Sequence, residues 1–324
     1  DPDRAADFAI KQFGEDRGGE IAKALTAGSL AGGGATIPQE FSSEVIELLR
    51  ARTVTRKMGA RQIPLPGGSA TVPRMTGGGS ASYVGEGTDA PKSEQSFGQM
   101  KLTAKKLSAL TPVSNDLIKY SSVSIDSMIR DDLIASLQLA EDAAFLRGSG
   151  TEFTPKGIRN SLNATNVIAA NATVNVANIM QDLGKAENAL MNANVSLVNP
   201  GYVLNPTTYN YLKNLLNANG VRVFPELDTG RLRGYPVEFT TQVPSNLGGG
   251  GNESEVYFVN FIDFVIADVE AYDVKVSSET SYMDGATLVS AFSRDETVLN
   301  VIARHDCGMR YDRSAAVLTG AIWR

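Results

Sequence analysis

The clearest pattern in the chain is a helical repeat of apolar residues between positions 124 and 147. Apolar side chains recur there mostly at steps of three and four residues: Ile125, Met128, Ile129, Leu133, Leu137, Ala140 and Ala144. This spacing places them on one face of an α-helix, which Ser124 can cap and Gly148 can end. The pattern therefore predicts one helix of about 24 residues, or about 36 Å at 1.5 Å per residue.

Shorter apolar patterns predict the remaining elements. Helices are expected over residues 38–49, 177–192 and 206–219, the last with Asn205 as its cap and Gly220 after its end. Apolar runs, several of them alternating, predict strands. These strands are residues 70–75, 81–84, 100–113, 197–204, 237–241, 255–261, 264–269, 272–277, 297–310 and 315–323. Helices and strands mix without strict β-α-β alternation, which predicts an α+β fold.

Residues 64–99 differ from the rest of the chain because they contain eight glycines in 36 positions. Such a segment cannot form a core of its own, and this length without a periodic apolar face is unusual inside a compact domain. Either it is disordered or it is an extended hairpin that packs on something else. Residues 1–36 are polar and end in an alanine- and glycine-rich run, which predicts an N-terminal arm with little order of its own.

Composition narrows the possible functions. The 324 residues include 36 acidic and 30 basic side chains, and the net charge is −6. A dedicated nucleic-acid-binding protein usually has a basic excess, so this class is disfavoured. One cysteine and one histidine exclude an internal disulfide framework and the usual zinc ligand sets within one chain. A reducing compartment is therefore expected.

The ends and the hydropathy of the chain favour a soluble intracellular product. No apolar run approaches the ~18 residues of a membrane span, and Asp1-Pro2-Asp3-Arg4 lacks the features of a signal peptide. We therefore expect no contact with membranes. A chain that begins at Asp1 leaves proteolytic trimming open.

Two motifs bear on enzymatic chemistry. Residues 85–90 match the dinucleotide pattern G-x-G-x-x-A, but Pro91 and a polar stretch follow where a helix would have to begin. His305 and Cys307 could share one face of a strand, so the Cys-His dyad of a cysteine-dependent hydrolase is geometrically possible. The simpler interpretation is a polar pair on a long strand. We expect no enzyme activity, no catalytic residue, no cofactor and no metal.

Charge patterning predicts a contact between copies of the chain. The basic stretch consists of Arg50, Arg52, Arg56, Lys57 and Arg61, with no acid among them. It could meet phosphates, the carboxylates of a neighbour or only water. The glycine-rich segment carries Glu86, Asp89 and Glu94 against Arg74 and Lys92, so its distal half is acidic. If this segment docks on another copy, the basic stretch is its expected counterpart.

The order of these segments resembles the major capsid proteins of tailed bacteriophages, which have the HK-ninety-seven-type or Johnson fold. An arm, an amphipathic helix, a glycine-rich hairpin, a returning strand that ends near residues 110–114 and a long helix that ends at Gly148 follow in the order of that family. Shorter similarities lie at residues 148–158, 203–208, 232–237 and 315–321. The resemblance covers about residues 35–324.

The resemblance implies a division of the chain. Residues 1–36 would be the N-terminal arm and residues 64–99 the extended loop that lies over a neighbouring subunit. The peripheral domain would comprise residues 37–63, 100–158 with the spine helix at 124–147, and the return strands at 259–310. The axial domain would comprise residues 159–258 and the closing strand at 311–324.

The function implied by the resemblance is structural. Many copies would form the hexamers and pentamers of an icosahedral shell that encloses packaged double-stranded DNA. Ordering a glycine-rich hairpin without a core costs on the order of 1 kcal/mol per residue or more, and a partner surface can supply the missing burial. The implied partners are the chain itself, a portal, a scaffold or maturation protease, decoration proteins, and DNA in non-specific contact. The implied location is the virion, after assembly in the cytoplasm of a bacterial host.

Several alternatives stay open at this stage. The shell of an encapsulin-like bacterial nanocompartment shares the fold but encloses cargo enzymes. A secreted Asn/Gly-rich adhesin is a further alternative, since residues 160–219 include fifteen asparagines. Some capsid proteins join a loop lysine to an asparagine of a neighbour by an isopeptide bond. Lys92 could be this lysine, but the asparagine position falls at Thr297, with Asn300 the nearest alternative, so no cross-link is expected.

Overall fold

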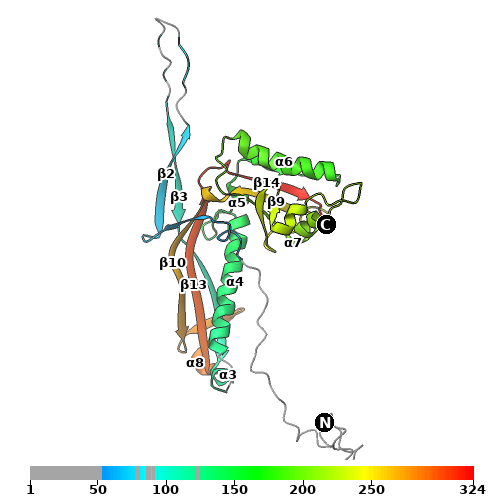
Figure 1. Ribbon diagram of the computed structural model, residues 1–324. Helices are drawn as coiled ribbons and strands as arrows, with labels where there is room; N and C mark the ends of the chain where they lie inside the picture. The colour runs from blue at the N-terminus through cyan, green and yellow to red at the C-terminus, as the bar shows by residue number, and fades with distance from the viewer. Residues whose placement is uncertain (1–52, 78–80, 85–88, 90–91, 93, 121–124) are drawn as a thin grey trace, which may run out of the picture. The chain divides into compact units, whose positions relative to one another are not determined.

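The computed structural model describes residues 53–77, 81–84, 89, 92, 94–120 and 125–324, which form an α+β fold with two main sheets (Figure 1). The predicted arm, the helix expected over 38–49, Arg50, Arg52 and Glu86 lie outside the described residues. No helix in the described ranges is long and apolar enough to cross a membrane.

The first sheet has four strands in the order β1-β10-β13-β4. They are β1 (Arg61–Pro64), β4 (Lys105–Ser114), β10 (Phe264–Ser277) and β13 (Glu296–Met309). β13 pairs antiparallel with β10 and β4, and β1 pairs parallel with β10. The two strands expected over 264–269 and 272–277 are thus one strand, because register shifts near Asp268 and Glu270 break the alternation without ending the ladder.

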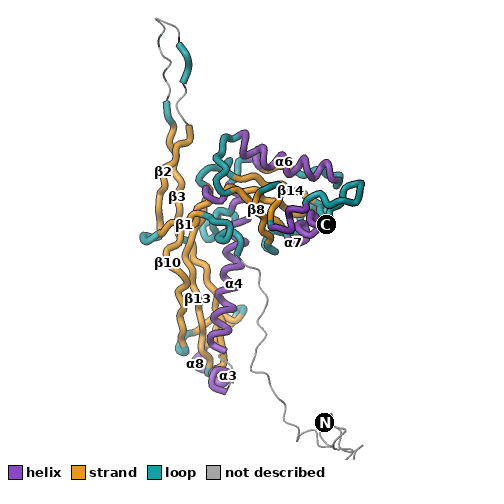
Figure 2. Tube along the Cα trace, in the orientation of Figure 1, coloured by secondary structure: helices purple, strands orange, loops and turns teal. Residues whose placement is uncertain are grey.

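The predicted long helix is α4 (Ile125–Arg147), and it lies along the first sheet (Figures 1 and 2). Leu133 and Leu137 of α4 pack with Val113, Leu299 and Val301 of the sheet. The end of the first sheet away from the second also carries α3 (Asn115–Tyr120), α8 (Ala291–Arg294), β11 (Ser281–Asp284) and β12 (Thr287–Ser290).

The second sheet has six strands in the order β5-β14-β9-β6-β8-β7. They are β5 (Val167–Ala169), β6 (Pro200–Leu204), β7 (Arg231–Leu232), β8 (Tyr235–Phe239), β9 (Ser254–Asn260) and β14 (Ala315–Ala321). Both β6 and β9 are buried along their whole length. Their side chains pack with those of α6 (Val176–Asn192) and α7 (Pro206–Asn214), and α5 (Ile158–Ser161) follows the end of α4.

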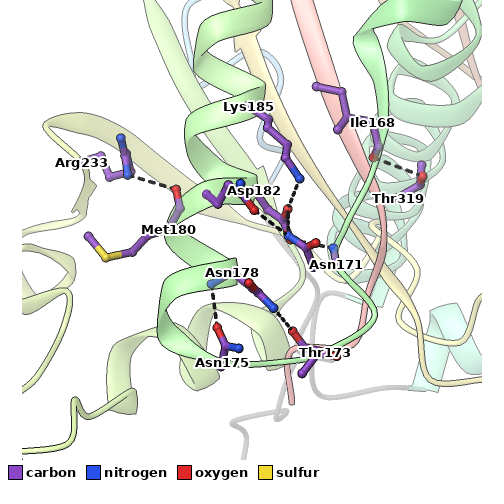
Figure 3. Close-up of polar contacts among 11 residues, drawn as sticks. Ile168, Asn171, Thr173, Asn175, Asn178, Met180, Asp182, Lys185, Arg233 and Thr319 are labelled. Carbon is purple, nitrogen blue, oxygen red and sulfur yellow. Dashed lines mark hydrogen bonds and ion pairs between the residues drawn. The ribbon is translucent and has the colours of Figure 1, made fainter.

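Asparagine side chains explain how the asparagine-rich region folds. Asn175 caps α6 by accepting a hydrogen bond from the backbone nitrogen of Asn178, and the Asn178 side chain donates to the carbonyl of Thr173 (Figure 3). In the same view Asn171 donates to both carboxylate oxygens of Asp182, from its backbone and from its side chain. Such local hydrogen bonds favour turns and helix caps, so many asparagines here serve chain geometry.

The helix α7 is shorter than predicted. It begins as expected with Asn205 as its cap and Pro206 in its first turn, but it ends at Asn214 instead of near Asn219. Beyond it the Asn217 side chain accepts hydrogen bonds from the backbone nitrogens of Asn219 and Val221, which closes a turn. Leu216, expected on the buried face of the helix, is consequently 52% exposed.

The glycine-rich segment contains an antiparallel hairpin of β2 (Ser69–Gly77) and β3 (Ser96–Thr103). The returning strand expected over 100–113 is two strands, β3 and β4, separated at Ala104. The strand expected over 81–84 does not form. Among the described residues of the hairpin, those at its foot reach a core, where Leu102 packs with Leu65, Val265 and Ala267.

Candidate functional site

The Cys-His pair is buried under α4. His305 and Cys307 on β13 are 4% and 3% exposed, and the His305 ring meets the Phe145 ring edge-on at 5.2 Å. Burial raises the pKa of the Cys307 thiol well above its ordinary value and lowers the pKa of His305 to about 4. A nucleophilic cysteine needs the opposite ionisation and access to a substrate. The arrangement therefore provides no support for the hydrolase hypothesis.

His305 also belongs to a group of three potential metal ligands, but a cation of the chain itself already binds the two carboxylates of this group. Glu141, Asp268 and His305 each place one donor atom within 4.8 Å of the others. The Arg56 guanidinium donates from Nε to Glu141 at 2.9 Å and from Nη1 and Nη2 to the two oxygens of Asp268, both at 2.8 Å. This fork is the geometry that makes arginine–carboxylate pairs strong. The group is thus an internal ion-pair cluster.

Protonation in this cluster follows from burial and from the arginine. The hydrogen bond to Asp268 raises the pKa of Arg56 further above its ordinary value, so the guanidinium stays charged. Burial raises the pKa of Glu141, although Arg56 beside it acts in the opposite direction. The cluster joins the turn at residues 54–59, the helix α4 and the strand β10.

Asp142, the residue after Glu141 on α4, holds the same turn by binding the backbone of the turn. Asp142 is 1% exposed and accepts hydrogen bonds from the backbone nitrogen of Val54 at 2.9 Å and from that of Thr55 at 3.1 Å. The Thr55 hydroxyl donates to the same carboxylate at 2.8 Å. Glu141 and Asp142 together therefore fix the point at which the chain enters the described fold.

These contacts revise the role expected for the basic stretch. Arg56 is engaged inside its own chain, and the Lys57 ammonium forms an ion pair with Glu238 at 2.6 Å. Arg61 is exposed at the start of β1. The expected uncompensated basic face is thus partly neutralised, because the acids that pair with it come from distant parts of the sequence. Whether Arg50, Arg52, Arg56, Lys57 or Arg61 meets a neighbour stays a prediction.

The charged residues of the hairpin are distributed between its foot and its distal half. Arg74 lies on β2, and its Nη1 donates to the carbonyl of Arg310 at 3.4 Å. Asp89, Lys92 and Glu94 are exposed, and Lys92 pairs with Glu94. Their contact with another copy stays a prediction as well.

The two positions considered for a cross-link both lie on β13. The Thr297 hydroxyl donates to the side-chain oxygen of Asn115, and the Asn300 side-chain oxygen is buried with no hydrogen-bond partner in the described part of the chain. Lys92 is exposed on the hairpin. The expected absence of a cross-link stays a prediction.

Another buried carboxylate joins the end of α4 to the second sheet. Glu255 on β9 accepts a hydrogen bond from the Tyr257 hydroxyl at 2.6 Å and lies 3.3 Å from Nε of Arg147 and 3.4 Å from Nε of Arg159. Burial raises the pKa of Tyr257 well above its ordinary value, so its hydroxyl stays a donor. Glu141, Asp142 and Glu255 were not singled out from the sequence, because the arginines and backbone groups that bind them lie 85 or more positions away in the chain and no local pattern distinguishes these acids from solvated ones.

Comparison with protein families gives one match over most of the chain. The sequence pattern of the Phage capsid family matches residues 33–320. The "Major capsid protein" of Klebsiella oxytoca phage phiKO2 is 41% identical over 323 residues, which are 98% of this chain and 74% of that protein. The "Capsid polyprotein" of Pseudomonas phage PAJU2 is 27% identical over 315 residues, which are 93% of this chain and 46% of that protein.

Solved structures show the same fold at low sequence identity. A structure from Mycobacterium phage Adephagia superimposes with a TM-score of 0.73 at 14% identity, and covers 90% of this chain and 97% of that chain. The capsid of an empty GTA particle superimposes with a TM-score of 0.74 at 17% identity, and covers 91% of this chain and 99% of that chain.

Proposed function

Because the chain belongs to the phage capsid family and is a major capsid protein of a phage, we propose that its copies form the hexamers and pentamers of an icosahedral shell around packaged double-stranded DNA. Its fold is the HK-ninety-seven-type or Johnson fold, so the family and the fold predicted from the order of segments are confirmed. The encapsulin-like alternative is not favoured, since the relatives in sequence are capsid proteins of phages.

The exposed hairpin is the observation that carries the proposed subunit contact. Exposed and partly buried side chains alternate along β3, yet three large apolar side chains of the hairpin find no core: Phe97 on β3 is 70% exposed, Met75 on β2 is 49% exposed and Tyr83 between the strands is fully exposed. Ordering such a segment is unfavourable in a monomer. A neighbouring copy that covers these side chains would supply the missing burial, at about 25 cal/mol per Å² of apolar surface.

The remaining assignments belong to the same proposal. The arm, extended loop, peripheral domain and axial domain have the residue ranges given by the resemblance. Portal, scaffold or maturation protease and decoration proteins are the further partners, and assembly takes place in the host cytoplasm. The buried, protonated Cys307 supports a purely structural role without catalysis. The net charge of −6 suits a subunit that encloses DNA without binding it tightly.

Light scattering behind size-exclusion chromatography, with negative-stain imaging of the leading peak, tests the proposal. We expect rings of five or six subunits, or closed shells. A monomer of 34.5 kDa under all conditions would contradict the proposal. Particles purified from an infected host should protect DNA from nuclease, and a shell filled with protein instead would point to a compartment.

A matched pair of variants connects assembly with the hairpin. Tyr83→Ser/Val84→Ser removes apolar side chains that make no core contact, so the fold of the monomer should persist while assembly weakens. Met180→Ser/Met191→Ser removes two other exposed apolar side chains, 44% and 48% exposed on α6, and controls for a general change of surface polarity. Equal assembly of both variants would argue against the hairpin contact.

A further inference from the structure

A hollow of about 770 Å³ lies at the foot of the hairpin. One wall is Arg74 and Met75 of β2, and another is the turn Arg310–Ser314 between β13 and β14. Residues 193–196, Val198, Asn260, Ile262 and Asp263 also line the hollow. All of these residues belong to the described part of the chain, and the proposed function assigns no role to them.

The charged side chains of the hollow leave a basic excess. Three arginines (Arg74, Arg310 and Arg313) and two aspartates (Asp263 and Asp312) line the hollow, so its net charge is +1. Asp263 is 8% exposed and already accepts a hydrogen bond from the Asn260 side chain at 2.7 Å. None of the three arginines forms an ion pair with a carboxylate of any described residue.

One arginine nitrogen in the lining of the hollow is buried and donates no hydrogen bond within the described part of the chain. Nε of Arg74 is buried and has no hydrogen-bond partner among the described residues, although its Nη1 reaches the carbonyl of Arg310. A buried donor without an acceptor costs free energy, and a carboxylate is the acceptor that an arginine binds most strongly. The Arg310 guanidinium lies 5.5 Å from the centre of the Tyr311 ring, so this pair offers a cationic and an apolar surface side by side.

Exposed apolar side chains complete the lining. Met75, Val198, Ile262 and Tyr311 are 49%, 68%, 39% and 41% exposed. The hollow is thus suited to a peptide segment that carries apolar and acidic side chains close together. An inorganic anion would use the arginines but would leave these four side chains in water.

The distal half of the hairpin has this combination. Tyr83 and Val84 are exposed, and the sequence continues with Glu86 and Asp89. The third acid, Glu94, is paired with Lys92. Tyr83 follows Arg74 by nine positions, and an extended chain of this length spans about 30 Å.

We propose that the hollow at the foot of the hairpin receives the acidic distal half of the hairpin of a second copy of this chain. The proposal rests on the proposed function, because it names the surface on which the extended loop docks. The distal half of the hairpin and the hollow are different surfaces of the chain, so the contact between two copies is heterologous. Repeated heterologous contacts close into a ring when the rotation between neighbouring copies permits it. Glu86 and Asp89 would face Arg310 and Arg313, while Tyr83 and Val84 would cover Met75 and Ile262.

Charge reversal on each side tests the pairing. Glu86→Lys/Asp89→Lys alters the hairpin and Arg310→Glu/Arg313→Glu alters the hollow. For each variant alone, the amount of protein that assembles into rings should fall roughly tenfold, because like charges then face each other. The control Lys106→Glu/Lys119→Glu makes the same change of net charge as the hollow variant on exposed residues elsewhere and should assemble like the unchanged chain.

Mixing the two variants gives the decisive result. In an alternating ring each contact again joins opposite charges, so an equal mixture should recover rings of six, while rings of five, which cannot alternate, should stay depleted. If both variants assemble like the unchanged chain, the pairing is wrong while the proposed function stands. If neither the mixture nor the chain with all four changes recovers rings, the hollow has another occupant, such as DNA phosphates or a different protein, and the inference is overturned. If the unchanged chain itself stays monomeric, the proposed function fails.

A disulfide trap covers the case in which charge reversal disturbs folding. Asp89→Cys/Arg313→Cys should give a ladder of covalently linked subunits when assembled particles are oxidised, because a disulfide needs Cα atoms within about 4.4–6.8 Å of each other. Each single cysteine variant is its control, and the native Cys307 is buried. Assembled particles that yield only monomers after oxidation would overturn the inference.

Discussion

Asp142 on α4 accepts hydrogen bonds from both the backbone nitrogen and the hydroxyl of Thr55, although the two residues are 87 positions apart. The backbone nitrogen of Val54 donates to the same carboxylate. Three donors on one buried carboxylate therefore tie the turn that opens the described fold directly to α4.

Asp142→Ala should lower the free energy of unfolding by at least about 2 kcal/mol, because three buried donors lose their acceptor. Urea unfolding of the subunit measures this loss. Asp142→Asn keeps one acceptor oxygen and should lose less. Hydrogen exchange of the Val54 and Thr55 amides should accelerate in Asp142→Ala, and unchanged exchange there would show that the carboxylate does not hold the turn.

Arg56→Gln should be strongly destabilising, by about 3–5 kcal/mol, because it leaves two carboxylates without their cation. The side chains of Arg56, Glu141 and Asp268 are 27%, 3% and 29% exposed, so solvent compensates only in part. The adjacent Lys57 is the control, since its side chain is 56% exposed and Lys57→Gln should cost less than about 1 kcal/mol. If Arg56→Gln and Lys57→Gln lowered the free energy of unfolding equally in urea, the ion-pair cluster around Arg56 would not be an important stabilising element.

The subunit should lose stability as the pH falls from 6.5 towards 4 because of His305. Its pKa is lowered from 6.5 to about 4 in the fold, mainly by burial, so the unfolded chain binds more protons in this interval and stability rises with pH. The difference corresponds to at most about 3 kcal/mol. Unfolding midpoints at pH 7 and pH 4.5 measure it.

His305→Phe is the matched variant, because a phenyl ring can keep the contact with Phe145 without titrating. Comparison with the unchanged chain separates His305 from the carboxylates, which also titrate at low pH. We expect the variant to lose less stability between the two pH values. The same pH dependence in both proteins would contradict the role of His305.

Gly148 should not tolerate a side chain. A Cβ atom at this position would lie 2.2 Å from the carbonyl oxygen of Pro155 and 2.4 Å from that of Ala144, and both are backbone atoms. Gly148→Ala should therefore destabilise the subunit by about 1–3 kcal/mol or more. Gly249→Ala, where nothing lies within 4 Å, should change stability by less than about 1 kcal/mol in the same thermal or urea unfolding experiment.

The Cys307 thiol should react with an aromatic disulfide reagent only after unfolding. It is 3% exposed and its pKa is raised by burial, so few thiolates form in the fold. One thiol per chain should become reactive in guanidinium chloride. Fast reaction of the folded subunit, or loss of a hydrolytic activity in Cys307→Ser, would revive the hydrolase hypothesis.

The elements that local patterns determine were predictable from the sequence. The helix expected over 124–147 is α4, and the helix expected over 177–192 is α6, shifted at its start by one residue. The long strand β13 was predicted within one residue at each end, since Val298, Leu299, Val301 and Ile302 form a mainly apolar run within it. The bulged strand β10 was divided in two, because a bulge interrupts the two-residue period on which such a prediction depends.

The charge contacts were less predictable, because their partners are far apart in the chain. Arg56 looked like part of an uncompensated basic face, yet its acids lie 85 and 212 positions away. Arg310 and Arg313 flank a short turn between two predicted strands, and nothing local distinguishes them from solvated side chains. Only the packing of β2 against this turn brings Arg74 to them.

The position of β14 between two earlier strands determines when, during synthesis, the second sheet can be completed. β14 lies between β5 and β9, and residues 316–323 supply Ala316, Leu318, Ala321 and Trp323 to the apolar core that α6 covers. A nascent chain that has not yet produced these residues leaves β5 and β9 without their shared neighbour. This sheet therefore cannot be completed until residue 323 has left the exit tunnel of the ribosome, and unfinished chains lack part of its apolar core.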